Sequence, residues 1–149
     1  MAVSTCGVLG VGYEGRDIKD FISDLVDLGV SRVVDVRLTP ISRKPGFSKT
    51  RLGAALDTVG IAYDHRRELG NPKANRAGFA GSVTELARAK AAYSQLLVGG
   101  EARRALDELA SSARRERVAV LCFEADQYRC HRDVVLAELS GRAERAALL

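Results

Sequence analysis

Short apolar segments alternate with helical segments along this chain, and this alternation restricts the fold more than any other feature. The predicted strands are residues 6–12, 32–36, 61–65 and 118–123. The predicted helices are residues 17–28, 48–59, 82–98, 101–115 and 129–140, separated by loops at 37–47 and 66–81. Ser48 is the expected N-cap of the second helix, and Ser82 with Glu85 matches a capping box. Strands alternating with helices favour an α/β fold.

The expected architecture is a single α/β domain of residues 1–149. It is a Rossmann-like or flavodoxin-like three-layer sandwich, with a short, mostly parallel sheet flanked by helices on both faces. A length of 149 residues suits one domain with a sizeable core. In such sheets, ligands bind beyond the carboxyl ends of the strands.

Charge and cysteine content restrict the partners. The net charge of +4 favours small anionic ligands such as phosphates, and it is weaker than the charge of a dedicated nucleic-acid binder. Three cysteines, an odd number, do not indicate a disulfide framework, so reduced thiols and a cytoplasmic location are expected. Neither a signal peptide nor a membrane span is predicted. A homodimer is compatible with the sequence, which does not determine the oligomeric state.

Unusual polar side chains follow all four predicted strands. Because the carboxyl ends of parallel strands meet at one edge, these side chains are expected to converge there. The candidate ligand-binding residues are Tyr13, Glu14, Arg37, Ser42, Arg43, Phe47, His65 and Arg132, and the candidate catalytic residues are Glu124, Cys130 and His131.

Gly10, Gly12 and Gly15 fit the dinucleotide-binding pattern G-x-G-x-x-G, and Asp35 lies 20 residues after Gly15. Tyr13 would crowd a loop that has to hold a pyrophosphate, and the chain is short for a dinucleotide half plus a catalytic domain. We therefore expect no dinucleotide and no other cofactor. The glycines then form a tight strand-to-helix turn, or a turn that presents its polar residues to a ligand.

The loop at 37–47 is the second candidate. Arg37 and Arg43 each carry a planar guanidinium that matches a carboxylate or phosphate, and Ser42 adds a hydroxyl. Phe47 could stack on a base or fill the core under the loop. The alternative interpretation is a solvated basic loop in which Arg37 pairs with Asp35 or Glu14.

The segment LCFEADQYRCHR, residues 121–132, is the third candidate. Cys122 and Cys130 are eight positions apart, whereas structural zinc sites place cysteines two to four residues apart, so no metal site is predicted. A catalytic metal on His65, His131 and Glu124 has no spacing signature. Cys130 is either a reactive thiol in the first turn of a helix, activated by nearby arginines, or a core residue. Cys122 is expected in the core.

Four stretches together resemble the domain of unknown function 488 family. They are residues 12–16, residues 35–47, Leu69 with Gly70, and the cysteine-rich segment, of which C-x-E followed by C-H-R is the most specific part. The resemblance implies an α/β sandwich, and it implies that Tyr13, Arg37, Ser42, Arg43, Glu124, Cys130, His131 and Arg132 occupy motif positions without giving their roles. The sequence departs from the family at Gly10, so the G-x-G-x-x-G match is coincidental.

The preferred hypothesis is a basic pocket for a small phosphorylated or nucleotide-like molecule. In it, arginines bind the anion, Glu124 and His131 move protons, and Cys130 is the nucleophile of any covalent step. The first alternative is a nucleic-acid-binding or nucleic-acid-processing module, with Tyr13, Phe47 or Tyr128 stacking on bases. The second is a thiol redox or metal-dependent enzyme.

Overall fold

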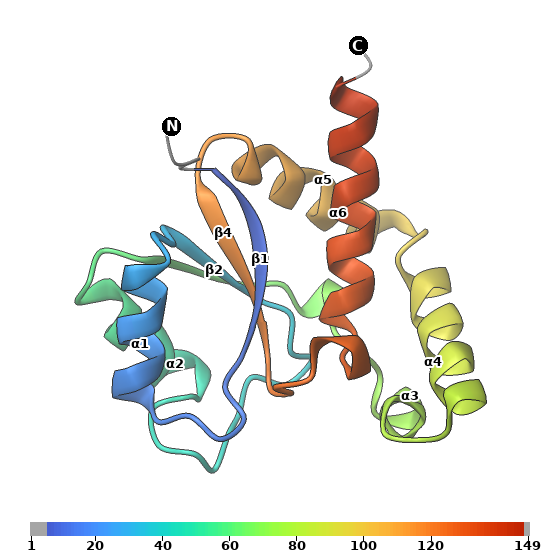
Figure 1. Ribbon diagram of the computed structural model, residues 1–149, viewed down its shortest axis with the longest axis horizontal. Helices are drawn as coiled ribbons and strands as arrows, with labels where there is room; N and C mark the ends of the chain where they lie inside the picture. Colours follow the sequence, from blue (N-terminus) through green and yellow to red (C-terminus); the bar gives the residue numbers. More distant parts are fainter. Residues whose placement is uncertain (1–5, 148–149) are drawn as a thin grey trace.

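The computed structural model describes residues 6–147 and contains a four-stranded parallel sheet (Figure 1). Its strands are β1 (Gly7–Gly12), β2 (Arg32–Asp35), β3 (Ala62–His65) and β4 (Arg117–Cys122). The strands lie in the order β1-β4-β2-β3, and every neighbouring pair is parallel. The sheet confirms the expected α/β class. It also places the ends of β1, β4 and β2 side by side, which brings together segments distant in the sequence.

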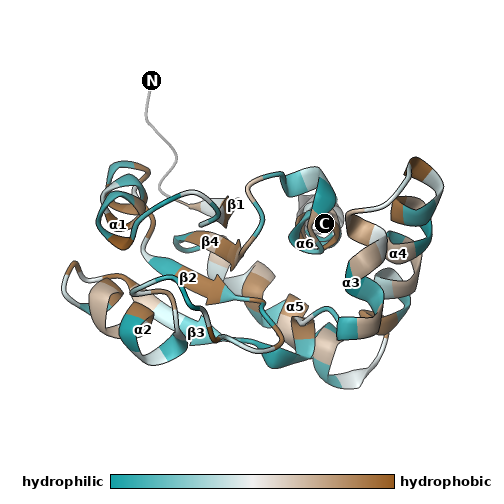
Figure 2. Ribbon diagram, turned by 90° about the horizontal axis from the view of Figure 1, so that it is seen from below, coloured by the Kyte–Doolittle hydropathy of each residue, from teal (hydrophilic) through white to brown (hydrophobic). Residues whose placement is uncertain are grey.

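Helices cover both faces of the sheet (Figures 1 and 2). One face packs against α1 (Ile18–Asp27) and α2 (Lys49–Asp57). The other packs against α5 (Gly100–Ala113) and α6 (Arg132–Ala147), and α4 (Val83–Leu96) with α3 (Lys73–Phe79) lies beyond them, against α6. Successive side chains of β4 alternate between the two layers: Val120 joins the core with the later helices, and Leu121 joins the core with α1 and α2. The result is the expected three-layer sandwich.

Local signals place most helix ends within two residues of their predicted positions. The capping box at Ser82 is present, because its side chain accepts from Glu85 N while Glu85 accepts from Ser82 N. Ser48 occupies the N-cap position of α2, but its hydroxyl exchanges hydrogen bonds with the backbone of Ser42 instead of capping the helix. This contact ties the basic loop at 37–47 to the start of α2.

Two predictions of local structure, one of a loop and one of a helix start, were wrong. The predicted loop at 66–81 contains a 3-10 turn (Arg67–Leu69) and α3, whose seven residues are too few for a clear apolar period. Phe79 and Asn75 anchor α3, Phe79 in the core and Asn75 through the Ala89 carbonyl. The last helix begins at Arg132 instead of residue 129, because a 3-10 turn (Gln127–Arg129), capped by the Asp126 side chain, comes first.

In Figure 2, hydrophobic colours are seen in the central strands β2 and β4, and hydrophilic colours lie mainly on the helices and loops around them. The buried core contains residues of β2, β4 and both helical layers, and partly buried side chains of β1 and β3, such as Leu9 and Tyr63, pack against it. Within residues 6–147, no helix is both long and apolar enough to cross a membrane.

Candidate anion-binding pocket

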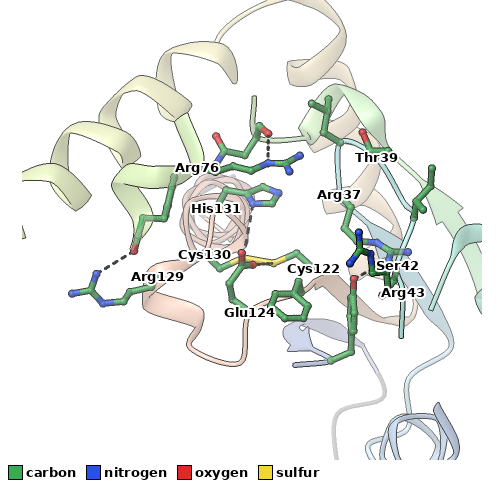
Figure 3. Close-up of a pocket in the computed structure, with 16 residues that line it drawn as sticks. Arg37, Thr39, Ser42, Arg43, Arg76, Cys122, Glu124, Arg129, Cys130 and His131 are labelled. Atoms are coloured by element: carbon green, nitrogen blue, oxygen red, sulfur yellow. Dashed lines mark hydrogen bonds between the residues drawn. A yellow bond between two sulfur atoms is a disulfide. The ribbon is translucent and has the colours of Figure 1, made fainter. Parts of the chain in front are cut away.

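A cavity of about 360 Å³ lies at the carboxyl ends of the strands, where ligand sites of parallel α/β sheets are expected (Figure 3). Its volume is in the range of small-molecule sites. The lining residues come from the ends of β1, β2 and β4 and from α3, namely Tyr13, Arg37, Leu38, Thr39, Ile41, Ser42, Arg43, Asn71, Arg76, Phe79, Cys122, Phe123, Glu124, Arg129, Cys130 and His131.

Most residues singled out from the sequence line this cavity. They are Tyr13, Arg37, Ser42, Arg43, Glu124, Cys130 and His131. Four others lie around it. Glu14 is exposed and accepts a hydrogen bond from Ala125 N at 3.0 Å, and Phe47 is fully buried. The Nε2 atom of His65 lies 2.8 Å from the Arg37 carbonyl oxygen. Arg132 is buried in contact with Cys122. Those four are not among the residues that line the cavity.

Arg37 is held by its own neighbours. Its guanidinium donates to both carboxylate oxygens of Asp35, to Tyr13 Oη at 3.0 Å and to the Phe47 carbonyl at 2.7 Å. Tyr63 adds a further hydrogen bond to Asp35, at 2.5 Å. Burial by itself lowers the pKa of Arg37, but the Asp35 carboxylate more than compensates and raises it. Arg37 therefore forms part of the cavity wall, and the buried Asp35 carboxylate offsets most of its charge.

Two aromatic residues form the base of this wall. The rings of Tyr13 and Phe47 stack with centroids 4.4 Å apart. Tyr13 is 3 % exposed and Phe47 is fully buried, so the stacked faces are already occupied. Their packing fixes the loop at 37–47 against the end of β1.

Three other arginines supply positive charge to the cavity. Arg43 and Arg76 are exposed, and Arg129 donates to the carbonyls of Phe79 and Gly81 at 3.1 and 2.9 Å. Within residues 6–147, none of the three forms an ion pair with a carboxylate. Arg76, with Asn71, comes from the segment at 66–81, and its role was missed because it follows no strand directly. The available signal was its positive charge in the segment that follows the Leu69–Gly70 motif.

The two cysteines that line the cavity are paired. Cys122 and Cys130 form a disulfide (Figure 3), which corrects the expectation that these thiols stay apart and reduced. The cysteine count could not show this pairing, because it depends on the turn at residues 123–129 folding back beside β4. Each side chain is 1 % exposed. Cys122 is a core residue as predicted, and Cys130 precedes α6 instead of lying in its first turn.

His131 has a defined orientation. Its Nε2 lies 2.8 Å from the Val36 carbonyl. Because a carbonyl only accepts, Nε2 carries the proton and Nδ1 has a free lone pair. Nδ1 lies 3.9 Å from Cys130 Sγ. Burial lowers the pKa of His131 to about 4, with the Val36 carbonyl opposing part of the shift, so the imidazole is neutral near pH 7.

Arg132 lies under the disulfide. Its guanidinium is 2 % exposed, with Nη1 3.0 Å from Cys122 Sγ and Nη2 3.4 Å from the Ala125 carbonyl. Its Nε has no hydrogen-bond partner among the described residues. Burial lowers the pKa of Arg132, and the nearby Glu124 carboxylate opposes this shift. Glu124 Oε2 itself lies 3.3 Å from Cys122 Sγ, so a cation and a carboxylate both contact one sulfur.

Three side chains that line the cavity are also of the types that bind metal ions. Cys122, Cys130 and His131 each offer one ligand atom, and these atoms lie within 4.8 Å of one another. Thiolates and imidazole suit zinc, but two sulfurs joined to each other cannot both act as thiolate ligands. A metal would therefore require the reduced protein.

The glycines of the G-x-G-x-x-G match have packing roles in this structure. A Cβ on Gly12 would lie 1.9 Å from the Glu124 carbonyl oxygen, and one on Gly10 would lie 2.1 Å from Gln127 Oε1. Gly15 has φ = 76°, a left-handed conformation that suits glycine. The first two glycines therefore let β1 approach the turn after β4 closely.

The fold and the cavity define a parallel α/β protein with a cationic pocket at the carboxyl ends of its strands. The chain belongs to the family described as "Domain of unknown function DUF488", whose model matches residues 17–139. This match confirms the resemblance found in the sequence. Comparison with curated proteins and with solved structures gave no match.

Proposed function

We propose that the cavity binds a small anionic molecule, of a phosphorylated or nucleotide-like kind. The supporting observation is the charge of its lining: Arg43, Arg76 and Arg129 line it without carboxylate partners among the described residues. A guanidinium binds phosphate or carboxylate through paired N–H donors. Glu124 is the carboxylate side chain in the described lining, so the net charge of the cavity favours an anion.

The same cavity carries groups for proton transfer and nucleophilic attack. Glu124 and His131 line it, and in the reduced protein the Cys130 thiol would have the free lone pair of His131 as its nearest base. A reaction that uses this nucleophile requires the disulfide to be open. Binding of the anion does not, so binding is the first property to test.

Calorimetric titration tests the proposal with adenosine 5′-monophosphate, inorganic phosphate and adenosine. We expect the nucleotide to bind and adenosine to bind much more weakly, because only the nucleotide carries phosphate. Arg43→Gln should weaken nucleotide binding by about ten- to a hundredfold, the effect of losing about 1.5–3 kcal/mol of charged hydrogen bonding. Arg88→Gln, an exposed arginine of α4 outside the cavity, is the matched control. Equal affinities for nucleotide and adenosine would refute the proposal.

One observation supports the nucleic-acid alternative. A second hollow of about 420 Å³ shares Ser42 and Arg43 with the cavity and is also lined by Lys44, Lys49 and Arg51. This basic surface could follow a phosphate backbone. The aromatic residues support it less, because Tyr13 and Phe47 are buried and Lys90 Nζ lies 3.6 Å from the ring centroid of Tyr128. Absence of a gel shift with single-stranded oligonucleotides at low salt would eliminate this alternative.

A further inference from the structure

The sulfurs of Cys122 and Cys130 can be reached through the cavity. Each residue is 1 % exposed, yet both line the cavity. A reagent that meets either sulfur must therefore be small enough to enter the cavity between the loop at 37–47 and the segments that carry Arg76 and Arg129. This arrangement differs from a purely structural disulfide in the core, which has no route for a reaction partner.

The two sulfurs have different surroundings, which gives each a different role. Arg132 Nη1 contacts Cys122 Sγ at 3.0 Å, and this buried cation stabilises a thiolate there. A thiol with a lower pKa leaves faster in thiol–disulfide exchange. Cys122 is therefore the better leaving group when the disulfide is attacked, and the attack falls on Cys130.

Cys130 has a base within reach. The free lone pair of His131 Nδ1 lies 3.9 Å from Cys130 Sγ, because the Val36 carbonyl holds the proton on Nε2. Glu124 Oε2 lies 3.3 Å from Cys122 Sγ and can exchange a proton with that sulfur. Each cysteine thus has its own proton partner, as a reaction that makes and consumes two thiols requires.

We propose that Cys122 and Cys130 are a redox-active pair that exchanges with a small anionic thiol bound in the cavity. This inference rests on the proposed anion site. A thiolate RS⁻ attacks Cys130 Sγ, forms a Cys130–S–S–R bond and releases Cys122 as a thiolate beside Arg132. A second RS⁻ attacks the R-bound sulfur and forms RSSR. Cys130 leaves as a thiolate.

Electrons and protons balance in this sequence. Two RSH molecules are oxidised to one RSSR, and the protein disulfide is reduced to two thiols. The two protons lost by the RSH molecules pass to Cys122, through Glu124, and to Cys130, through His131. In the reverse direction, Cys130 attacks the anionic disulfide RSSR, Cys122 resolves the mixed disulfide, and two RSH molecules are released.

The charge of the cavity selects the partner. Arg43, Arg76 and Arg129 line the same cavity as the two cysteines, and none of them has a carboxylate partner among the described residues. A thiol that also carries a sulfonate, carboxylate or phosphate group would be concentrated there. Clefts lined by one sign of charge raise the association rates of oppositely charged molecules by about 10–1000-fold. The expected class is an anionic thiol or its disulfide.

Peptide mapping tests the pair in the full chain, in a Cys6→Ser background. Trypsin separates the two sulfurs into peptides 118–129 and 130–132. Air-oxidised protein should yield these two peptides linked, and reduction should release them. When Cys6→Ser/Cys122→Ser is treated with the symmetrical disulfide of 2-mercaptoethanesulfonate, one 2-mercaptoethanesulfonate should stay bound to peptide 130–132. Unlinked peptides in oxidised protein would overturn the proposal. It would also be overturned if the reduced protein bound one equivalent of zinc and kept it, with both cysteines still reduced, in the presence of that disulfide.

Rates of disulfide opening test the partner without any change at the cysteines. 2-Mercaptoethanesulfonate and 2-mercaptoethanol share a carbon skeleton and differ in charge. At equal thiolate concentration, the sulfonate should open the disulfide about tenfold faster or more, and Arg43→Gln should remove most of this difference while Arg88→Gln keeps it. Equal rates together with intact nucleotide binding would overturn this inference alone. Loss of nucleotide binding with the rate difference retained would overturn the nucleotide proposal alone.

Discussion

The guanidinium of Arg132 contacts the sulfur of Cys122 at 3.0 Å, and neither side chain is more than 2 % exposed. Within residues 6–147, no carboxylate forms an ion pair with Arg132. A buried cation without a paired carboxylate is costly. Arg132 lies beside a sulfur that becomes negative on reduction, so its charge can stabilise the thiolate of Cys122.

Arg132→Met should slow the alkylation of Cys122 at neutral pH, because removal of the cation raises the pKa of the thiol. The measurement is the alkylation rate against pH in a Cys6→Ser/Cys130→Ser background. The free energy of unfolding should change by less than about 2 kcal/mol, since replacing a buried charge with an apolar side chain also removes a desolvation cost. An unchanged pH profile would contradict the assigned role of Arg132.

His131 should make stability depend on pH. Its pKa is lowered from 6.5 to about 4 by burial, so the unfolded chain binds the proton more tightly than the folded chain does. The contribution is fully present above pH 6.5 and is lost as the pH falls toward 4, amounting to roughly 3 kcal/mol. Urea unfolding between pH 7 and 4 measures this loss. His131→Gln should show a shallower decline than the wild type, and an equally steep decline would contradict it.

Asp35→Asn should destabilise the fold by about 3–5 kcal/mol, because it leaves the buried Arg37 guanidinium without its carboxylate. The double variant Asp35→Asn/Arg37→Met should lose less than the sum of the two single variants, as expected for a coupled pair. Denaturant unfolding measures both. Glu138→Gln, which removes an exposed partner of Arg142, is the control and should cost less than about 1 kcal/mol. Additive losses would show that Asp35 and Arg37 act separately.

Gly12→Ala should destabilise the protein by about 1–3 kcal/mol, the usual cost of overpacking, since its Cβ would lie 1.9 Å from the Glu124 carbonyl oxygen. It should also weaken nucleotide binding, because the displaced backbone belongs to the turn at residues 123–129 that carries Arg129. Gly100→Ala is the matched control, because it lies in the first turn of α5 with open space around it. Thermal unfolding and calorimetry compare the two. Equal effects of the two substitutions would show that the contact with residue 124 is unimportant.

The sequence predicted the edge of the sheet where the cavity lies, but only part of its lining. Residues in the segments that follow strands, such as Arg43 and Glu124, were found because strand ends converge at one edge. Arg76 was missed, because α3 is too short to show a period and reaches the cavity only through packing against α4. Arg37 and Phe47 were taken as ligand-binding residues, yet their contacts are mainly internal.

The sequence by itself determined the α/β class, the capping box at Ser82 and the family, because these depend on local periodicity and on motifs read in order. Only the tertiary structure decided that β4 lies between β1 and β2, that Cys122 and Cys130 meet, and that Arg132 lies beneath them. These relationships join residues through chain turns and sheet pairing. Their distances follow from three-dimensional packing, which spacing along a single chain does not encode.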